Sequence, residues 1–231
     1  MNTDNMALSG ETIDYGPCAF MEGYAPGTVF SSIDRQGRYA YANQPLILGW
    51  NLARLAEALL PLIDPDGEKA VEIANSRLVG IAALYRAEWL AVMRRKLALA
   101  GEDPGDEELV EDLLKAMEGA DWTLTFRRLQ GAVSGEGLLR PLFSDFTAMA
   151  EWLPRWRARL AADAPMLLRA ANPAVIPRNQ RVEEALEAAT AGDMAPFHAL
   201  LAAVTRPFEE NEGYMLPAPS GFGRYVTYCG T

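Results

Sequence analysis

Oxygen-bearing side chains gather close to the N-terminus of this chain. Asp4 and Asn5 are followed, after an intervening segment, by Asp14 within the string Asp-Tyr-Gly-Pro at 14–17. A turn through Leu8-Ser9-Gly10 would bring Asp4 and Asn5 close to Asp14. Carboxylate and amide oxygens are the hard ligands that Mg²⁺ and Mn²⁺ prefer, and a triphosphate would complete the coordination shell. The segment indicates a metal and nucleotide site, although the same residue types also form ordinary turns and helix caps.

The string at 13–16, Ile-Asp-Tyr-Gly, has the form of the Asp-aromatic-Gly element with which kinases hold metal against nucleotide phosphates. In that arrangement an Asn is the second metal ligand, and Asn5 has the right chemistry for it. Gly16 would give the backbone the freedom that such a turn requires. The motif alone is short, so its interpretation depends on the elements around it.

The elements that must position these residues begin with loops. Residues 1–42 are rich in Gly, Pro, Asn, Asp and Tyr and have no helical period, which predicts loops and short strands. From Gln44 the pattern becomes helical, because Leu48, Leu52, Leu55 and Leu59 recur at helical spacing. We expect this helix to end between Pro61 and the turn at 64–67, and to bury one apolar stripe.

A longer helix is expected over 68–99, ended by Gly101 and Pro104. Further helical patterns follow, separated by Gly, Pro and Asn-Pro, over 106–117, 122–129, 144–162, 178–190 and 194–204. The tail at 205–231 contains a β-like piece over 224–228. The sequence therefore predicts a single mainly α domain with three parts, which are site loops at 1–42, a helical body at 43–204 and a C-terminal tail at 205–231.

Composition excludes several classes of function. The chain has 231 residues and a formal net charge of −10, which disfavours a nucleic-acid surface. The single histidine, His198, and two widely separated cysteines exclude a His-rich metal cluster and a CxxC zinc site. We find no apolar run of about 20 residues and no signal-peptide pattern, so we expect a cytoplasmic chain without membrane association. The five tryptophans recur in phase with leucines and are expected in the core.

A longer set of strings changes the interpretation of the N-terminal motif. It comprises NTDNM at 2–6, TIDYGP at 12–17, DRQGRYAYANQP at 34–45, WNLARLAEALLPL at 50–62, Asn172-Pro173, Pro177-Arg178-Asn179 and a near-terminal cysteine. Together these resemble the selenoprotein O family, also called SelO or YdiU. Its members are kinase-like proteins, pseudokinases by motif, that transfer AMP from ATP to protein hydroxyls. The resemblance implies a protein-kinase-like C-terminal lobe, with a short β and loop segment followed by a helical array.

The resemblance also implies roles for individual residues. Asp4 matches the proton acceptor proposed for the family, Asn5 and Asp14 match its metal ligands, and Asp14 also lies against the nucleotide phosphates. The implied reaction is adenylylation of Ser, Thr or Tyr hydroxyls in protein substrates, with ATP as the nucleotide substrate and Mg²⁺ or Mn²⁺ as the cofactor. For Arg178 and Asn179 the sequence indicates only helix capping and turn geometry.

This sequence departs from the family in length. A family member is about twice as long, and its N-terminal lobe supplies a glycine-rich nucleotide loop, a lysine with its glutamate partner and phosphate-clamping arginines. None of these is found here, so we expect the chain to be inactive unless it is joined to an N-terminal lobe, in the same chain or as a separate one. The alternative is a catalytically silent helical fragment that acts as a protein-interaction module.

Cys18 and Cys229 allow two interpretations. In a cytosolic chain, two reduced and partly buried thiols are expected. The family resemblance implies redox control instead, because members carry a near-terminal selenocysteine or cysteine that pairs with one close to the active site. The position expected for that partner falls in Thr28-Val29-Phe30, so only Cys18 can substitute for it.

Overall fold

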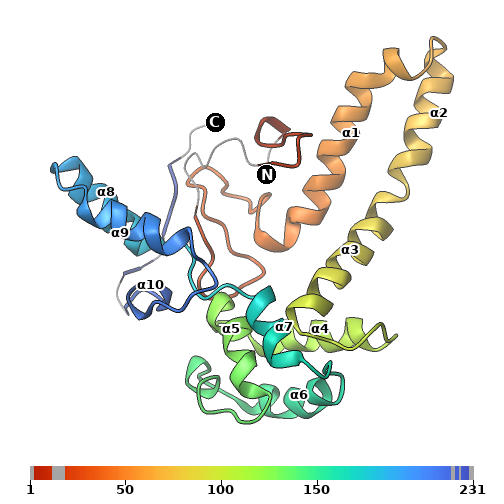
Figure 1. Cartoon of the computed structure of the whole chain (residues 1–231). Helices are drawn as coiled ribbons and strands as arrows, with labels where there is room; N and C mark the ends of the chain where they lie inside the picture. The colour runs from red at the N-terminus through yellow and green to blue at the C-terminus, as the bar shows by residue number, and fades with distance from the viewer. Residues whose placement is uncertain (1–2, 12–18, 220–221, 224, 229–231) are drawn as a thin grey trace. The chain divides into compact units, whose positions relative to one another are not determined.

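The computed structural model describes residues 3–11, 19–219, 222–223 and 225–228 (Figure 1). Three residues of the predicted site, Asp14, Cys18 and Cys229, lie outside these ranges. The described part is mainly helical, which confirms the predicted class. Its contacts group into two compact units. The first consists of Met1–Cys18, Pro26–Trp89 and Val226–Thr231, and the second of Ala19–Ala25 and Leu90–Tyr225.

The helices of the first unit begin with α1, Gln44–Ile63, as the leucine spacing predicts. Pro45 lies in its first turn, where a missing N–H costs nothing. The helix ends at Ile63, because the backbone of the next residue, Asp64, is extended. The second helix, α2, Gly67–Leu78, begins at Asp66, whose carboxylate accepts hydrogen bonds from the N–H groups of Glu68 and Lys69. α1 and α2 run side by side as a helical hairpin (Figure 1).

The single helix predicted over 68–99 is two helices. α2 ends at Leu78, and α3, Ile81–Lys96, begins after the turn at Val79 and Gly80. Glycine is among the poorest helix formers, and here it is enough to interrupt the continuous apolar pattern. The boundary between the two compact units falls inside α3, after Trp89.

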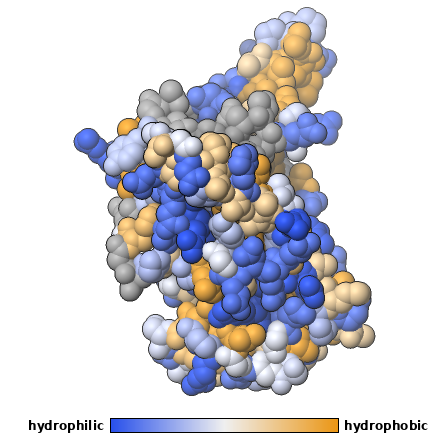
Figure 2. All heavy atoms as spheres, turned by 60° about the vertical axis from the view of Figure 1, so that its left-hand side comes forward, coloured by the Kyte–Doolittle hydropathy of each residue, from blue (hydrophilic) through white to orange (hydrophobic). Residues whose placement is uncertain are grey.

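The prediction that α1 buries an apolar stripe is wrong within this chain. Only Ile47 and Asn51 of α1 are buried, and Leu62 at its end is 82% exposed. The expectation of no membrane-length apolar segment needs the same correction, because Tyr41–Ile63 is long and apolar enough to span a bilayer, with 11% of its apolar window buried. Figure 2 shows apolar side chains gathered at the far end of the α1–α2 hairpin.

The second unit contains the remaining helices of the described chain. They are α4, Asp106–Ala116; α5, Trp122–Ala132; α6, Thr147–Ala158; α7, Ala164–Ala171; α8, Asn179–Thr190; α9, Ala195–Val204; and α10, Glu212–Met215. α4, α8 and α9 match the sequence prediction within one residue. α6 is shorter at both ends than expected, α5 extends further than expected, and α7 and α10 were not predicted.

The core of the second unit includes two stacked tryptophans. Trp152 and Trp156 of α6 are buried, with ring centroids 5.4 Å apart. The indole N–H of Trp152 donates to the Leu109 carbonyl at 2.7 Å, and that of Trp156 donates to the Leu97 carbonyl at 2.9 Å. The expectation of core tryptophans is confirmed for this pair and wrong for Trp50 in the first unit, which is 40% exposed.

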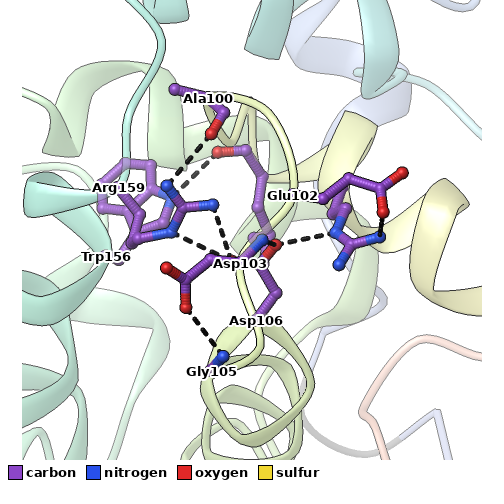
Figure 3. Close-up of polar contacts among 9 residues, drawn as sticks. Ala100, Glu102, Asp103, Gly105, Asp106, Trp156 and Arg159 are labelled. Carbon is purple, nitrogen blue, oxygen red and sulfur yellow. Dashed lines mark hydrogen bonds and ion pairs between the residues drawn. The ribbon is translucent and has the colours of Figure 1, made fainter.

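A buried carboxylate joins α3, α4 and α6 in the second unit (Figure 3). Asp106 is fully buried and accepts from Arg94 Nε at 2.7 Å, from Arg159 Nη2 at 2.9 Å and from the Asp103 N–H at 2.9 Å. Burial alone would raise the pKa of Asp106, but the hydrogen bonds from Arg94, the Asp103 amide and Arg159 outweigh it and lower that pKa. This cluster is structural, because its charges satisfy one another.

Strand pairing within the described residues is limited to isolated bridges. Gly23 pairs with Asp121 in antiparallel fashion, Ser31 pairs with Thr227 in parallel fashion, and Leu99 pairs with Leu160. The bridge at Thr227 lies within the β-like piece expected at 224–228, although no strand longer than a bridge forms in the described part.

Candidate functional site

The predicted catalytic residue and one predicted metal ligand lie together in the first unit. Asp4 and Asn5 belong to a single 3₁₀ turn, η1, Thr3–Asn5, and both are exposed. Among the described residues, no hydrogen bond or ion pair engages either side chain. A carboxylate and an amide oxygen on adjacent residues are therefore accessible to a ligand from solvent.

The residue after this turn is attached to α1. Asn51, which is buried, donates a hydrogen bond from its Nδ2 to the Sδ atom of Met6 at 2.8 Å. Because Met6 follows Asn5 directly, this contact sets how η1 lies against the helix. The apolar period predicts α1 but gives no sign of this contact, because Asn51 is a polar residue on a helix of leucines and its partner lies 45 residues away.

A groove lies between the N-terminal segment and α1, within the first unit. Its volume is about 430 Å³. One wall consists of Thr3, Met6, Ala7 and Leu8, and the other of Trp50, Asn51, Leu52, Arg54 and Leu55. Most of this lining is apolar, so the groove favours an apolar occupant beside the turn that carries Asp4.

Two guanidinium groups stack on Trp50 near this groove. Arg38 lies 4.8 Å and Arg54 lies 5.3 Å from the centroid of the indole ring. Asp34 fixes the Arg38 segment by accepting from the backbone N–H groups of Arg38 and Tyr39 at 2.9 and 2.8 Å. Arg54 also pairs with Glu57 on the next turn of α1. These contacts keep positive charge on the rim of the groove and assign Arg38 a stacking role that its sequence position did not reveal.

The segment that follows the predicted metal loop is anchored in the second unit. Asn179 holds Phe20 with two hydrogen bonds, accepting from its N–H at 3.0 Å and donating to its carbonyl at 2.8 Å. Such a pair mimics a β-bridge and fixes the backbone at that point. Phe20 lies six positions after Asp14 in the chain, so Asn179 fixes one end of the segment that follows the motif.

Arg178, next to Asn179, contacts the same segment two residues further along, at Glu22. Its side chain is 1% exposed and donates to Asp121 at 2.6 Å, to Glu22 at 3.4 Å and to the Met215 carbonyl at 2.7 Å. These two residues were assigned only capping and turn roles from the sequence. Their contacts could not be foreseen, because the chain brings their partners in from more than 30 residues away.

Metal binding in the described residues rests on few donors. The described part contains no group of three His, Cys, Asp or Glu side chains that could hold a metal ion. Asp4 and Asn5 supply two hard oxygen donors, and the third predicted donor, Asp14, lies outside the described residues. The donor chemistry of this pair fits Mg²⁺ or Mn²⁺ and does not fit a soft metal.

One lysine of the second unit has a strongly shifted pKa. Burial lowers the pKa of Lys96 to about 8. Its ammonium lies 4.3 Å from the centroid of the Phe126 ring and donates to the Asn172 Oδ1 at 2.9 Å. Asn172 in turn donates to the carbonyls of Lys96 and Leu168. This arrangement ties α3 to the end of α7, and it gives Asn172, one of the family-like residues, a structural role.

Comparison with known proteins gives the family context. A family model described as "Protein adenylyltransferase SelO" matches residues 1–205 of this chain. Among curated proteins, the chain is 65% identical to "Protein nucleotidyltransferase YdiU" of Cereibacter sphaeroides strain KD131, over its whole length and 49% of the relative. It is 52% identical to the protein of that name from Agrobacterium fabrum and 50% identical to that from Methylorubrum populi, again over the whole chain. The chain spans about half the length of the curated relatives it matches.

Proposed function

Because the chain belongs to the SelO family of protein adenylyltransferases, we propose that it is part of an enzyme that transfers AMP from ATP to hydroxyl groups of proteins. The proposal gives the chain the role of a kinase-like C-terminal lobe that works with an N-terminal lobe. The observation that carries it is the match of the whole of this chain to nucleotidyltransferase relatives. The exposed turn that carries Asp4 and Asn5, the residues to which the resemblance gives the catalytic and metal roles, supports it. Half-length coverage of the relatives fits a role as one part of such an enzyme.

The chain's own residues would act on the incoming hydroxyl and on the phosphates. Asp4 accepts the proton of a Ser, Thr or Tyr hydroxyl as the oxygen attacks the α-phosphorus. A phosphorus–oxygen bond to the substrate forms, the bond between the α-phosphorus and the bridging oxygen breaks, and pyrophosphate leaves. Asn5 and Asp14 would hold Mg²⁺ or Mn²⁺, which would supply charge neutralisation at the triphosphate.

The contacts around the turn support this assignment of roles. The hydrogen bond between Asn51 and Met6 attaches the turn to α1, which limits the movement of the backbone that carries the Asp4 carboxylate. Exposure of Asp4 leaves room for a protein side chain to approach. Two lobes are needed because most contacts to a nucleotide in kinase-like enzymes come from the N-terminal lobe.

The test is transfer of label from α-labelled ATP to protein, with Mg²⁺ or Mn²⁺. The reaction is run with this chain alone and with the chain co-expressed with the half of the Cereibacter sphaeroides relative that this chain does not match. We expect incorporation only when both halves are present, with at least a hundredfold loss in Asp4→Asn and in Asp14→Ala. Asp34→Asn is the control, because Asp34 caps a loop turn and carries no proposed role in transfer.

Two results would contradict the proposal. Label from γ-labelled ATP but not from α-labelled ATP would identify a phosphoryl transferase instead. No incorporation by a folded complex of both halves would favour the second candidate, an interaction module without catalysis. The observation in favour of that candidate is the exposed apolar surface of α1, which suits a protein partner whether or not transfer occurs.

A further inference from the structure

The leucines of α1 form a helix-packing stripe that this chain covers only in part. They follow the spacing four, three, four, three, which places them on one face of the helix, and they are Leu48, Leu52, Leu55, Leu59 and Leu62. None of the five is buried, and exposure rises to 39% at Leu59 and 82% at Leu62. A stripe with this period is the signature of a helix packed against another element.

The same face continues into the groove beside η1. Leu52 and Leu55 line the groove together with Met6 and with Leu8, which is 82% exposed. Groove and stripe therefore form one apolar surface, named here the α1 seam, which runs from the N-terminal segment to the end of the helix.

We infer that the α1 seam is the docking surface for the half of a family-length protein that this chain does not span. The relatives carry about as much sequence outside the matched region as within it, so a partner of comparable size belongs to the same assembly. The inference rests on the proposed function only in that both require the second half, and it holds whether the two halves share one chain or associate as two.

Two other occupants fit the seam less well. A lipid bilayer would meet Arg54 and Glu57 near the middle of the apolar segment Tyr41–Ile63, where charges are costly. A second copy of this chain would bring together two molecules that each carry a net charge of −10. The length of the relatives outside the matched region supports the second half of the protein as the occupant.

Covering the seam would also affect the candidate site. Thr3, next to Asp4, lines the groove, so an apolar partner in the groove would exclude water from one side of η1. It would also immobilise the Met6–Asn51 contact that attaches the turn to α1. The seam would thereby couple association of the halves to the position of Asp4.

The test co-expresses this chain with the unmatched half of the Cereibacter sphaeroides relative and measures complex formation by size-exclusion chromatography with light scattering. Dissociation on dilution gives the affinity. We expect a one-to-one complex that weakens about 100-fold in Leu55→Glu, which places a charge in the middle of the seam, and about 10-fold in Leu62→Glu at its outer end. Met166→Glu is the matched control, because Met166 is 64% exposed on α7, outside the seam.

Circular dichroism of each variant chain alone shows whether it retains its helices, and Leu62→Glu should retain them because Leu62 is exposed. Failure of the wild-type halves to associate overturns the inference, as does a complex that both seam variants leave intact. The inference is also overturned if this chain forms a homodimer that Leu62→Glu abolishes. The same holds if it binds phosphatidylcholine and phosphatidylglycerol vesicles and Leu62→Glu abolishes that binding. Transfer of α-label in the same samples separates the two proposals. Association through the seam without transfer refutes only the proposed function, and transfer that the seam variants leave unchanged refutes only this inference.

Discussion

The two compact units differ in how completely their polar side chains are paired and their apolar side chains are buried. In the second unit, strongly polar groups are buried and paired. Asp106 is enclosed by two arginines, Arg178 by two carboxylates, and Arg127 donates to the carbonyls of Arg169 and Asn172. In the first unit, the long apolar helix α1 buries only Ile47 and Asn51.

The second unit therefore gains more from its internal contacts than α1 of the first unit does. Burying a charge is tolerated only where the surrounding protein supplies its partners, and the second unit supplies them for Asp106 and Arg178. An exposed apolar stripe gains nothing from folding until another surface removes it from water. Variants in each unit test this contrast.

The largest effect is expected from removing a buried arginine that pairs with two carboxylates. Arg178→Ala leaves Asp121 buried without its cation and Glu22 without its own, and should lower the free energy of unfolding by about 3–5 kcal/mol. Urea denaturation followed by tryptophan fluorescence measures it. The matched control, Arg181→Ala, removes a surface pair with Glu184 and should cost less than about 0.5 kcal/mol. Equal effects of the two variants would show that Arg178 is not an internal tie.

The second prediction compares leucines directly. Leu113→Ala in α4 removes a fully buried side chain and should cost about 3 kcal/mol of stability. Leu62→Ala in α1 removes an exposed one and should stay within about 0.5 kcal/mol. The same urea titration serves both variants. A cost at Leu62 comparable to that at Leu113 would mean that the stripe is already buried in the isolated chain.

The third prediction concerns the acid side of the stability curve. Replacing the Asp106 carboxylate in Asp106→Asn weakens its charged hydrogen bonds and should cost on the order of 2 kcal/mol at pH 7. The folded-state pKa of Asp106 is lowered, so its contribution is fully present above the unfolded pKa near 4 and is lost as the pH falls through the folded value. The difference between wild type and variant should therefore shrink in acid. A difference that stays constant down to low pH would contradict the ion network.

The smallest predicted effect lies on the alkaline side. Burial lowers the pKa of Lys96 to about 8, below its unfolded value, so the folded state binds fewer protons than the unfolded state between pH 8 and roughly 10.5. Stability from this group therefore rises with pH across that window, by about 1–2 kcal/mol after allowance for partial exposure. Chemical denaturation at pH 7, 8.5 and 10 should show this rise in the wild type and not in Lys96→Met. A parallel pH profile in the two proteins would refute the shifted pKa.

Local patterns in the sequence were enough for most of the helices. The leucine spacing of α1 and the punctuation around α4, α8 and α9 gave the helix positions, because helical period and capping depend on neighbouring residues. The break at Val79 and Gly80 was missed because the apolar pattern runs through it. α7 was missed although Asp163 and Pro165 mark its start, because the preceding pattern had been extended as far as 162.

Burial and long-range pairing could not be predicted from the same patterns. The stripe of α1 was expected to be buried, yet none of its leucines is, because a helical period shows which side chains share a face and not what covers that face. The roles of Arg178 and Asn179 depend on Glu22 and Phe20, which lie more than 150 residues earlier in the chain. In the candidate site, the types and positions of Asp4 and Asn5 were apparent from the motif, whereas their attachment through Asn51 was not.

The most direct test of the contrast between the two units is hydrogen exchange measured by mass spectrometry. Amides of α1, Gln44–Ile63, and of α5, Trp122–Ala132, are followed in this chain alone and in its complex with the unmatched half of the Cereibacter sphaeroides relative. We expect the amides of α1 to exchange much faster than those of α5 in the isolated chain. In the complex, exchange of the α1 amides should slow while that of the α5 amides stays unchanged. Equal protection of α1 and α5 in the isolated chain, or no slowing of α1 in the complex, would contradict this contrast.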